Sequence, residues 1–233
     1  MTIAKLQPVA EAYRYERKFL VEGVTLREVQ QACLFHPAGF KPIFNPRTIN
    51  NIYFDTPGFQ HYYDNVEGDK HRLKVRIRWY GDMFGYIAKP VLEFKIKNGL
   101  LGLKDSYKLN AFTLDHSFSK ESIGQALDKK KIPAHIRDEV LGLQPALLNQ
   151  YYRHYYLSLD KKFRLTIDSN LNYRRISYHT PRFLEKYFDR EHIILEMKYG
   201  FHDDQEARFV SSQFPFLLTK SSKYVQGLEQ LLH

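Results

Sequence analysis

The stretch between Lys70 and Lys108 alternates charged and apolar residues with the period of a β-strand, and it constrains the fold more than any other part of the chain. Successive side chains of a strand point to opposite faces. One face of 72–79 is therefore wholly cationic and the other wholly apolar, with Arg72, Lys74, Arg76 and Arg78 against Leu73, Val75, Ile77 and Trp79. The next run repeats the pattern, placing Glu93, Lys95 and Lys97 opposite Leu92, Phe94 and Ile96.

The charge of this stretch is strongly one-sided. Residues 70–108 contain ten Lys/Arg and three Asp/Glu, a balance of +7 in a chain whose net charge is +9. If these faces were the solvent side of an ordinary antiparallel sheet, mixed signs would be expected, because like charges on neighbouring positions repel. Same-face neighbours lie only about 6.5–7 Å apart. A bound polyanion, most simply phosphate, explains the row of cations.

Composition sets the outer limits. A chain of 233 residues with 43% hydrophobic and 15% aromatic content is long enough for one large or two small folded domains. The single Cys33 excludes an internal disulfide and a cysteine metal cluster, which favours a reducing compartment. The start of the chain lacks the apolar run of a signal peptide, and no window offers the ~18–20 apolar residues of a membrane helix. The sequence therefore predicts a cytoplasmic protein with no membrane segment.

Most of the chain follows strand-like or helix-like patterns. Residues 1–10 are expected to be a loose terminus, and 11–233 a single domain. Besides the two basic strands, strands are predicted at 14–21, 48–54, 104–109, 146–159, 163–168, 171–178 and 192–199, with a hairpin turn at Asn98-Gly99. Helices are predicted at 25–35, 59–66, 118–131, 134–143, 203–213 and 222–232. This pattern predicts an α+β fold, a closed antiparallel β-barrel of about eight strands with peripheral helices.

The same acid–base pair recurs on three predicted strands, with the base two residues after the acid: Glu16/Lys18, Glu93/Lys95 and Glu196/Lys198. Another strand carries Arg164 and Asp168 on one face. In a closed barrel one face of every strand points inward. Charged faces that point inward would form a cationic tunnel with a few carboxylates. Arg and Lys suit phosphate oxygens, and carboxylates suit Mg²⁺ or Mn²⁺.

Six segments in chain order resemble one known family. They are 15–19 (YERKF), 50–56 (NNIYFDT), 72–81 (RLKVRIRWYG), 92–95 (LEFK), 195–198 (LEMK) and 220–224 (KSSKY). The sequence resembles the VTC (vacuolar transporter chaperone) domain of polyphosphate polymerases, within the CYTH-like triphosphate tunnel metalloenzyme superfamily. The resemblance covers nearly the whole chain. It implies an eight-stranded antiparallel tunnel that binds nucleoside triphosphate and polyphosphate.

The resemblance also implies residue roles. The family's basic strand corresponds to Arg76 and Arg78, its later tunnel arginine to Arg153, and its metal-holding glutamate to Glu196. We expect catalytic roles for Arg76, Arg78, Lys95 and Arg153, and metal binding by Glu196 and Glu93. Glu93 has an equally simple alternative role, pairing with neighbouring lysines. Phosphate binding is expected from Lys18, Arg72, Lys74, Lys97, Arg164, Lys198, Ser222 and Lys223. Ser222-Lys223 also opens a predicted helix, and helix N-termini attract phosphate.

The predicted function is a metal-dependent polyphosphate polymerase-type phosphotransferase that uses Mn²⁺ or Mg²⁺. Its partners would be ATP or another nucleoside triphosphate and inorganic polyphosphate. One alternative is a triphosphatase that uses the same tunnel. Hydrolytic relatives begin with Glu-x-Glu-x-Lys, whereas this first strand offers only Glu16 before Lys18, which weakens that alternative. The others are a non-catalytic polyphosphate sensor and a nucleic-acid-binding protein. No RRM, KH or helix-turn-helix pattern supports the last, so nucleic acid is not an expected partner.

Overall fold

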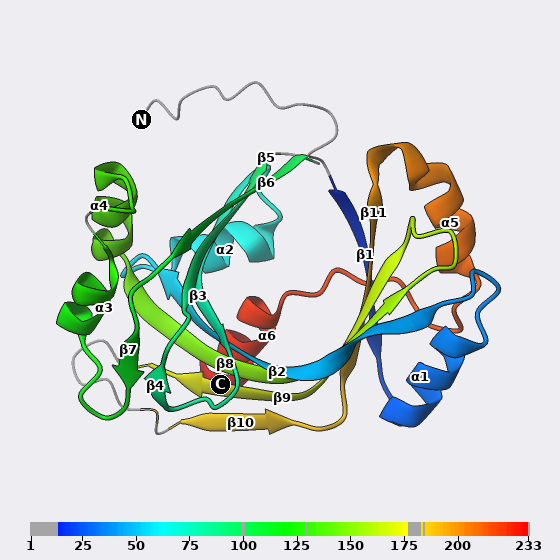
Figure 1. The fold of residues 1–233 in the computed structure, drawn as a ribbon, viewed down its shortest axis with the longest axis horizontal. Helices are drawn as coiled ribbons and strands as arrows, with labels where there is room; N and C mark the ends of the chain where they lie inside the picture. The colour runs from blue at the N-terminus through cyan, green and yellow to red at the C-terminus, as the bar shows by residue number, and fades with distance from the viewer. Residues whose placement is uncertain (1–13, 99–100, 129, 177–182, 184, 233) are drawn as a thin grey trace.

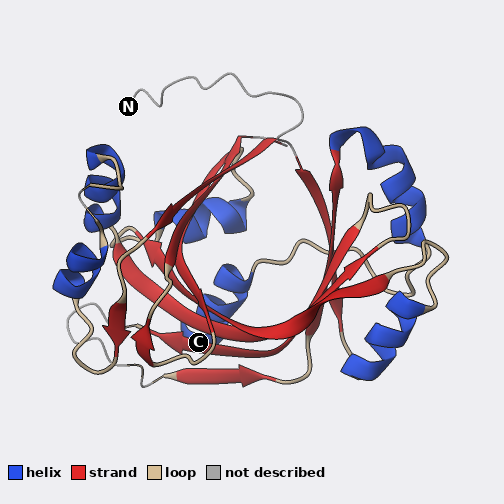
Figure 2. Cartoon of the chain, viewed as in Figure 1, coloured by secondary structure: helices blue, strands red, loops and turns tan. Residues whose placement is uncertain are grey.

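The computed structural model describes residues 14–98, 101–128, 130–176, 183 and 185–232. Its centre is one large antiparallel sheet that curls around a lumen, with helices at its two sides and a last helix behind the lumen (Figures 1 and 2). The predicted α+β class is confirmed. The expected loose terminus at 1–10 and the turn at Gly99 lie outside the described residues.

The main sheet has nine strands in the order β1-β11-β9-β8-β2-β3-β5-β6, with β10 paired to β9. A separate two-stranded sheet joins β4 and β7. The bounds are β1 Arg14–Val21, β2 Lys41–Asp55, β3 His71–Tyr80, β4 Gly85–Ile87, β5 Val91–Asn98, β6 Leu101–Lys108, β7 Phe112–Leu114, β8 Gln144–Leu157, β9 Arg164–Arg175, β10 Lys186–Asp189 and β11 Ile193–Gly200.

The sheet order places β1 and β6 at opposite ends, and no ladder between the described residues joins these two strands. A side-chain contact nevertheless connects the two ends of the curl. Lys95 Nζ on β5 lies 2.9 Å from Glu16 Oε1 on β1. The sheet is therefore strongly curved, with its first and penultimate strands brought within one ion pair of each other.

Six helices lie among the described residues: α1 Leu26–Leu34, α2 Gln60–Glu67, α3 Lys120–Ala126, α4 Ala134–Gly142, α5 Asp204–Ser212 and α6 Lys223–Leu232. α1 and α5 cover one side of the curled sheet, while α3 and α4 cover the other (Figure 1). None of the described helices has the length and apolarity needed to span a membrane. All six match predicted helices, although α3 ends well before residue 131.

Local sequence signals explain the first two helices. Thr25 caps α1, and Glu28 Oε2 accepts a hydrogen bond from the Thr25 backbone N–H at 2.6 Å, which completes a capping box. α2 ends at Gly68, whose φ of 77° lies in the left-handed region that glycine adopts without strain. The start of α1 and the end of α2 lie within one residue of the predicted bounds of these helices, 25–35 and 59–66.

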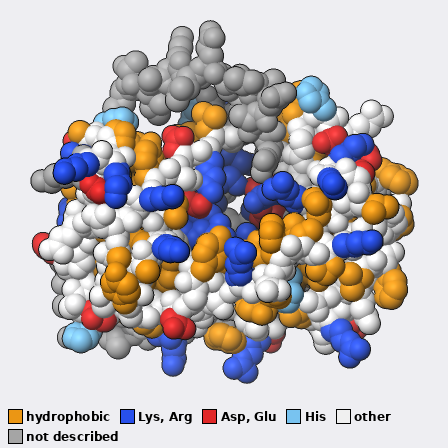
Figure 3. Space-filling view, in the orientation of Figure 1, with side chains coloured by type: hydrophobic (Ala, Val, Ile, Leu, Met, Phe, Trp, Pro, Cys, Tyr) orange, Lys and Arg blue, Asp and Glu red, His pale blue; other side chains and the backbone are white. Residues whose placement is uncertain are grey.

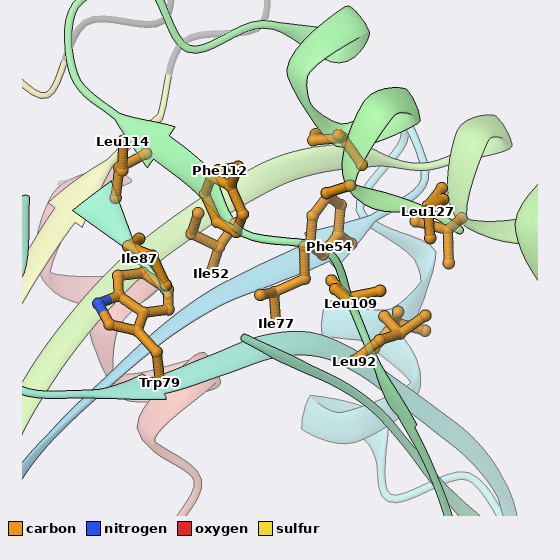
Figure 4. Packing of buried hydrophobic residues seen from close by; sticks show 14 of the residues in the cluster. Ile52, Phe54, Ile77, Trp79, Ile87, Leu92, Leu109, Phe112, Leu114 and Leu127 are labelled. Carbon is orange, nitrogen blue, oxygen red and sulfur yellow. The ribbon is translucent and has the colours of Figure 1, made fainter. Parts of the chain in front are cut away.

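The apolar faces of the basic strands form a core on the outer side of the sheet. Ile77 and Trp79 of β3 and Leu92 of β5 are buried against residues of β7 and α3, among them Phe112 (Figure 4). The opposite face of each strand is consequently turned to the lumen. The alternation that the sequence predicts for these two strands is confirmed.

α6 packs against the inner face of the sheet. Its Tyr224 and Leu228 are buried with Leu147 of β8 and Tyr173 of β9. Gly227 allows this close approach, because a Cβ there would lie 2.7 Å from Leu147 Cδ2. The helix therefore fills one end of the lumen with apolar side chains, and its N-terminus faces the charged part.

The strands differ from the prediction in three ways, and the first two differences have local causes. β9 is one strand where two were expected, because Asn170, with a φ of 52°, forms a bulge and not a turn. β2 begins at Lys41, earlier than predicted, although Pro42 and Pro46 disfavour central strands. That extension pairs only with β8, so its outer edge has no ladder to disrupt. The short strands β4, β7 and β10 were not predicted.

Candidate functional site: a cationic lumen

The lumen face is the set of side chains that the curled sheet and α6 turn toward each other. Lys and Arg gather in a hollow at the middle of the molecule, with a few Asp and Glu among them (Figure 3). The carboxylates of this face include Glu16, Glu93, Asp168 and Glu196; its cations include Lys18, Arg72, Lys74, Arg76, Arg78, Lys95, Lys97, Lys104, Arg153, Arg164, Lys198 and Lys223.

The first ionic cluster joins β1, β5 and β11. Lys18 Nζ lies 3.4 Å from Glu16 Oε1 and 3.6 Å from Glu196 Oε2, between the two carboxylates. Lys95 holds Glu16 from β5, and Lys198 Nζ lies 2.7 Å from Glu196 Oε1. Burial would raise the pKa of Glu16, but Lys18 and Lys95 outweigh it and hold the pKa at about 2. Both carboxylates are therefore ionised at neutral pH.

The second ionic cluster lies deeper, at the start of α6. Asp168 is fully buried and accepts hydrogen bonds from Arg153 Nε and Nη2 at 2.5 and 2.6 Å. Lys223 Nζ lies 2.5 Å from the Oδ2 of the same carboxylate and 4.7 Å from the centroid of the Tyr151 ring. Burial opposes ionisation of Asp168, yet Arg153 and Lys223 together lower its pKa to about 2. The cluster fixes Lys223 and Arg153 side by side.

α6 is held in place by a buried carboxylate outside the lumen face. Asp55, at the end of β2, accepts a hydrogen bond from the Tyr224 hydroxyl and backbone hydrogen bonds from His61 and Tyr62 at 2.9 Å each. Asp55, near the end of the 50–56 segment, therefore has a structural role: its hydrogen bonds connect the end of β2 to α2 and α6. Because Tyr224 follows Lys223, the same contact positions the lysine.

β3 supplies the longest row of cations. Arg76 is paired, since its Nη2 lies 2.6 Å from Glu93 Oε2 and its Nη1 donates to the Tyr53 hydroxyl at 3.3 Å. Lys74 Nζ donates to Ser222 Oγ at 2.6 Å, next to the start of α6. Glu93 is shared with Lys104 of β6, whose Nζ lies 2.5 Å away. Burial would raise the pKa of Glu93, but these cations, Arg76 first, lower it to about 2.

Other cations of the lumen face have no carboxylate partner among the described residues. Arg72 and Arg78 both keep a buried Nε that makes no hydrogen bond. Burial, followed by repulsion from Lys18 and Lys95, depresses the pKa of Lys74 well below its ordinary value. Burial and Arg72 likewise lower the pKa of Lys97. Buried donors are normally satisfied in proteins. These groups are arranged to receive an anion.

Glu16 and Glu196 form the donor set that best fits a divalent cation. The two carboxylates lie on either side of Lys18 Nζ, and the negative charge of Glu196 acts to raise the pKa of Glu16. Among the described residues, no three His, Cys, Asp or Glu side chains are grouped so that they could hold a metal ion together. Mg²⁺ is commonly held by one or two carboxylates, with water and substrate phosphates completing the shell. The pair fits that mode once the Lys18 ammonium group moves away from its position between Glu16 Oε1 and Glu196 Oε2.

The structure brings nearly all of the predicted site residues to one face. Arg164 is the outlying member: it is exposed at the start of β9, opposite Lys198. Glu93 sits in its own cluster with Arg76 and Lys104, so its predicted metal role stays a prediction. Sequence reasoning did not single out Tyr151, which is buried beside Arg153 and Lys223. The only signal was its position two residues before Arg153.

We include Tyr151 in the candidate site because three lumen cations act on its hydroxyl. Burial would raise the pKa of its hydroxyl, but Arg153, Arg78 and Lys223 outweigh burial and lower it. The phenol thus interacts with the same cations that face the lumen.

The comparison with protein families decides the identity of this fold. The family model described as VTC domain matches residues 13–232. This chain belongs to the VTC family. The predicted resemblance is therefore confirmed over the whole curled sheet and α6. No match was found among curated proteins.

Solved structures share the fold of this VTC domain at low sequence identity. A Hippeastrum protein, described as an adenylyl cyclase candidate with a dominant triphosphatase activity, has a TM-score of 0.50 and 15% identity, covering 92% of this chain and 96% of its own. An adenylate cyclase candidate from Vibrio parahaemolyticus has a TM-score of 0.51 and 12% identity, covering 94% and 99%. At these identities the likeness concerns the fold.

Proposed function

We propose that this VTC domain is a metal-dependent phosphotransferase of the polyphosphate polymerase type, with the lumen as its active site. The observation that carries the proposal is the set of lumen cations that have no carboxylate partner among the described residues: Arg72 and Arg78, whose buried Nε atoms make no hydrogen bond, and the crowded Lys74. A triphosphate supplies the acceptor oxygens and negative charge that these groups lack. Membership of the VTC family supports the same assignment.

The proposed reaction transfers one phosphoryl group. A terminal oxygen of the polyphosphate chain attacks the γ-phosphorus of a nucleoside triphosphate, the bond from that phosphorus to the β,γ-bridging oxygen breaks, and the nucleoside diphosphate leaves. Such a reaction depends on positioning and charge stabilisation more than on covalent chemistry. Arg76 and Arg78 of β3 and Arg153 of β8 face the lumen from the two strands that flank β2, and they would hold the reacting phosphates in line.

A bound Mg²⁺ or Mn²⁺ would supply additional charge stabilisation to the phosphate oxygens. Glu196 and Glu16 would hold it, while Lys18 moves to a phosphate oxygen. Replacing Glu196 with Gln keeps the size of the side chain and removes its charge. We expect turnover to fall roughly 10²–10³-fold, the range for loss of one group that stabilises transition-state charge.

The metal assignment is tested by Mn²⁺ titration calorimetry in the presence of a non-hydrolysable nucleotide. Glu196→Gln should weaken Mn²⁺ binding, and Glu93→Gln, the matched control in the other carboxylate cluster, should leave it unchanged. If Glu93→Gln weakens Mn²⁺ binding and Glu196→Gln does not, the ligand assignment moves to the Arg76 cluster.

The reaction class is tested by incubating the pure protein with labelled ATP and Mn²⁺ and separating long phosphate chains from free phosphate. Chains that grow with time support the polymerase. Free phosphate without chains identifies a triphosphatase, the activity described for the Hippeastrum structure with the same fold. Tight triphosphate binding without turnover identifies a sensor and contradicts the enzymatic proposal.

A further inference from the structure

One end of the lumen face carries aromatic rings. Phe44 stands opposite Tyr155 across the β2–β8 ladder, and Arg47 stands opposite Arg153. Directly opposed residues of an antiparallel pair share a face. Tyr80 follows Arg78 by two residues on β3, so it shares the face of the basic row. We call Phe44, Arg47, Tyr80 and Tyr155 the aromatic collar.

The collar is organised around one guanidinium group. The Arg47 Cζ lies 5.6 Å from the centroid of the Phe44 ring, 5.5 Å from that of Tyr80 and 5.9 Å from that of Tyr155. Phe44 and Tyr155 meet edge to face with centroids 5.8 Å apart. None of the described carboxylates pairs with Arg47 at salt-bridge distance. Three rings from three strand segments therefore surround a cation that has no acidic partner in the described part of the chain.

Two of the three aromatic residues are largely exposed. Phe44 is 56% exposed and Tyr80 is 54% exposed, although both belong to the face that lines the lumen. Burial keeps the pKa of the Tyr155 hydroxyl raised, so the phenol stays neutral. Flat, open aromatic surfaces beside guanidinium planes are the surroundings on which nucleobases stack. The collar offers both surfaces at one point.

The collar continues directly into the phosphate-binding row. Arg78 connects the two regions, because its Cζ lies 5.4 Å from the Tyr80 ring centroid while its Nε lacks a partner. Burial raises the pKa of the Tyr155 hydroxyl, and the positive charges of Arg153 and Arg78 both act against that rise. Arg76 and Tyr80 are four residues apart on one strand, about 13 Å at ~3.3 Å per residue. That span is comparable to an extended nucleoside triphosphate measured from its γ-phosphate to its base.

We propose that the aromatic collar binds the nucleoside of a nucleoside triphosphate, with the base stacked on Tyr80 and Phe44 and against the Arg47 guanidinium. The inference rests on the proposed function, because the triphosphate lies on Arg78, Arg76 and Arg153. It adds that the lumen has a direction: the base occupies the β2–β3 end, and the terminal phosphate points toward α6. Stacking accepts every base, since each has a π-face, so the collar selects nucleotides over inorganic phosphates without choosing among bases.

The test compares two ligands on the same protein by titration calorimetry: ATP and inorganic triphosphate. Tyr80→Ala should weaken ATP binding about 5- to 150-fold, the range for loss of one stacked base. The affinity for inorganic triphosphate should stay within about twofold. Tyr80→Phe should restore ATP binding, because the ring face carries the interaction. UTP should show the same pattern as ATP.

Two further variants complete the design. Phe44→Leu removes a second ring and should also weaken ATP selectively. Tyr86→Ala is the matched control, because Tyr86 is 74% exposed on the separate β4–β7 sheet and outside the lumen face. An equal loss for ATP and inorganic triphosphate in Tyr80→Ala would overturn the inference, since the ring would then only support β3. Unchanged ATP binding in both collar variants would also overturn it. Failure of the wild type to bind inorganic triphosphate would contradict the proposed function itself.

Discussion

At the scale of the residue, the lumen combines paired and unpaired ions. Asp168 is fully buried and neutralised by Arg153 and Lys223, whereas Arg78 and Lys74 have no carboxylate partner in the described part of the chain. The paired ions fix the geometry of the side chains around them. The unpaired ions raise the free energy of the empty protein, because like charges are held together in partly buried positions. The cations without a carboxylate partner therefore contribute to ligand affinity and not to the stability of the empty protein, whereas paired cations such as Arg76 and Arg153 contribute to stability as well.

Asp168→Asn should destabilise the fold by about 3–5 kcal/mol, because it leaves two cations without their buried counter-ion. The pKa of Asp168 is about 2 in the folded protein against 3.8 ordinarily, so its stabilising contribution is complete above pH 3.8 and is lost as the pH falls toward 2. Urea denaturation from neutral pH to pH 2 measures both effects. The variant should lack this part of the acid dependence, and a variant as stable as the wild type would contradict the role of the cluster.

Lys74 predicts a proton linkage for ligand binding. Its pKa is depressed in the empty lumen, and an anion beside it should restore the pKa toward the ordinary 10.5. Between the depressed and the ordinary value, triphosphate binding should take up protons, and its affinity should fall as the pH rises. Calorimetry in buffers of different ionisation enthalpy measures the uptake. Lys74→Met should reduce it, and equal uptake in both proteins would assign the linkage to another group.

At the scale of the element, the strands whose two faces differ sharply were the most predictable. The central parts of both strands, 72–79 of β3 and 92–97 of β5, alternate strictly between charged and apolar residues, so their lumen residues could be assigned from the sequence alone. β9 could not be predicted as one continuous strand, because Ser169-Asn170 has the sequence of a turn. Only its pairing with β8 makes it a bulge. Tyr151 could not be assigned to the site either, because its contact with Lys223 joins residues that are far apart in the sequence. Such long-range contacts leave no local pattern.

Two neighbours on β3 should respond differently to substitution. Arg78→Gln removes a cation without a carboxylate partner, so stability should change by no more than about 0.5 kcal/mol. Triphosphate affinity should fall roughly 10- to 150-fold, equivalent to a lost charge-assisted hydrogen bond of about 1.5–3 kcal/mol.

Arg76→Gln, on the same face, also takes a partner from Glu93 and should lower both stability and affinity. Melting temperature without ligand and triphosphate calorimetry distinguish the two variants. Identical effects of the two substitutions would show that pairing with Glu93 does not matter to β3.

At the scale of the whole molecule, the charge of the lumen couples folding to ligand. Triphosphate neutralises clustered cations only when the strands are assembled, so it should raise the melting temperature. The rise should shrink as salt is added, because counter-ions screen the partly exposed lysines first. Differential scanning fluorimetry with millimolar triphosphate, at low and high salt, measures this. An unchanged melting temperature at low salt would remove the lumen as the triphosphate site.

The close seat of α6 has a consequence for the size of what the lumen holds. Gly227 lies one helical turn after Lys223, about 6 Å along the axis at 1.5 Å per residue, so the two residues move together as parts of one rigid rod. The close contact of Gly227 with Leu147 and Tyr173, on the apolar side of α6, fixes how closely the helix approaches the sheet. In the proposed complex, the length of the phosphate chain that fits between α6 and the collar would therefore depend on the absence of a Cβ at Gly227, a position on the apolar side of the helix.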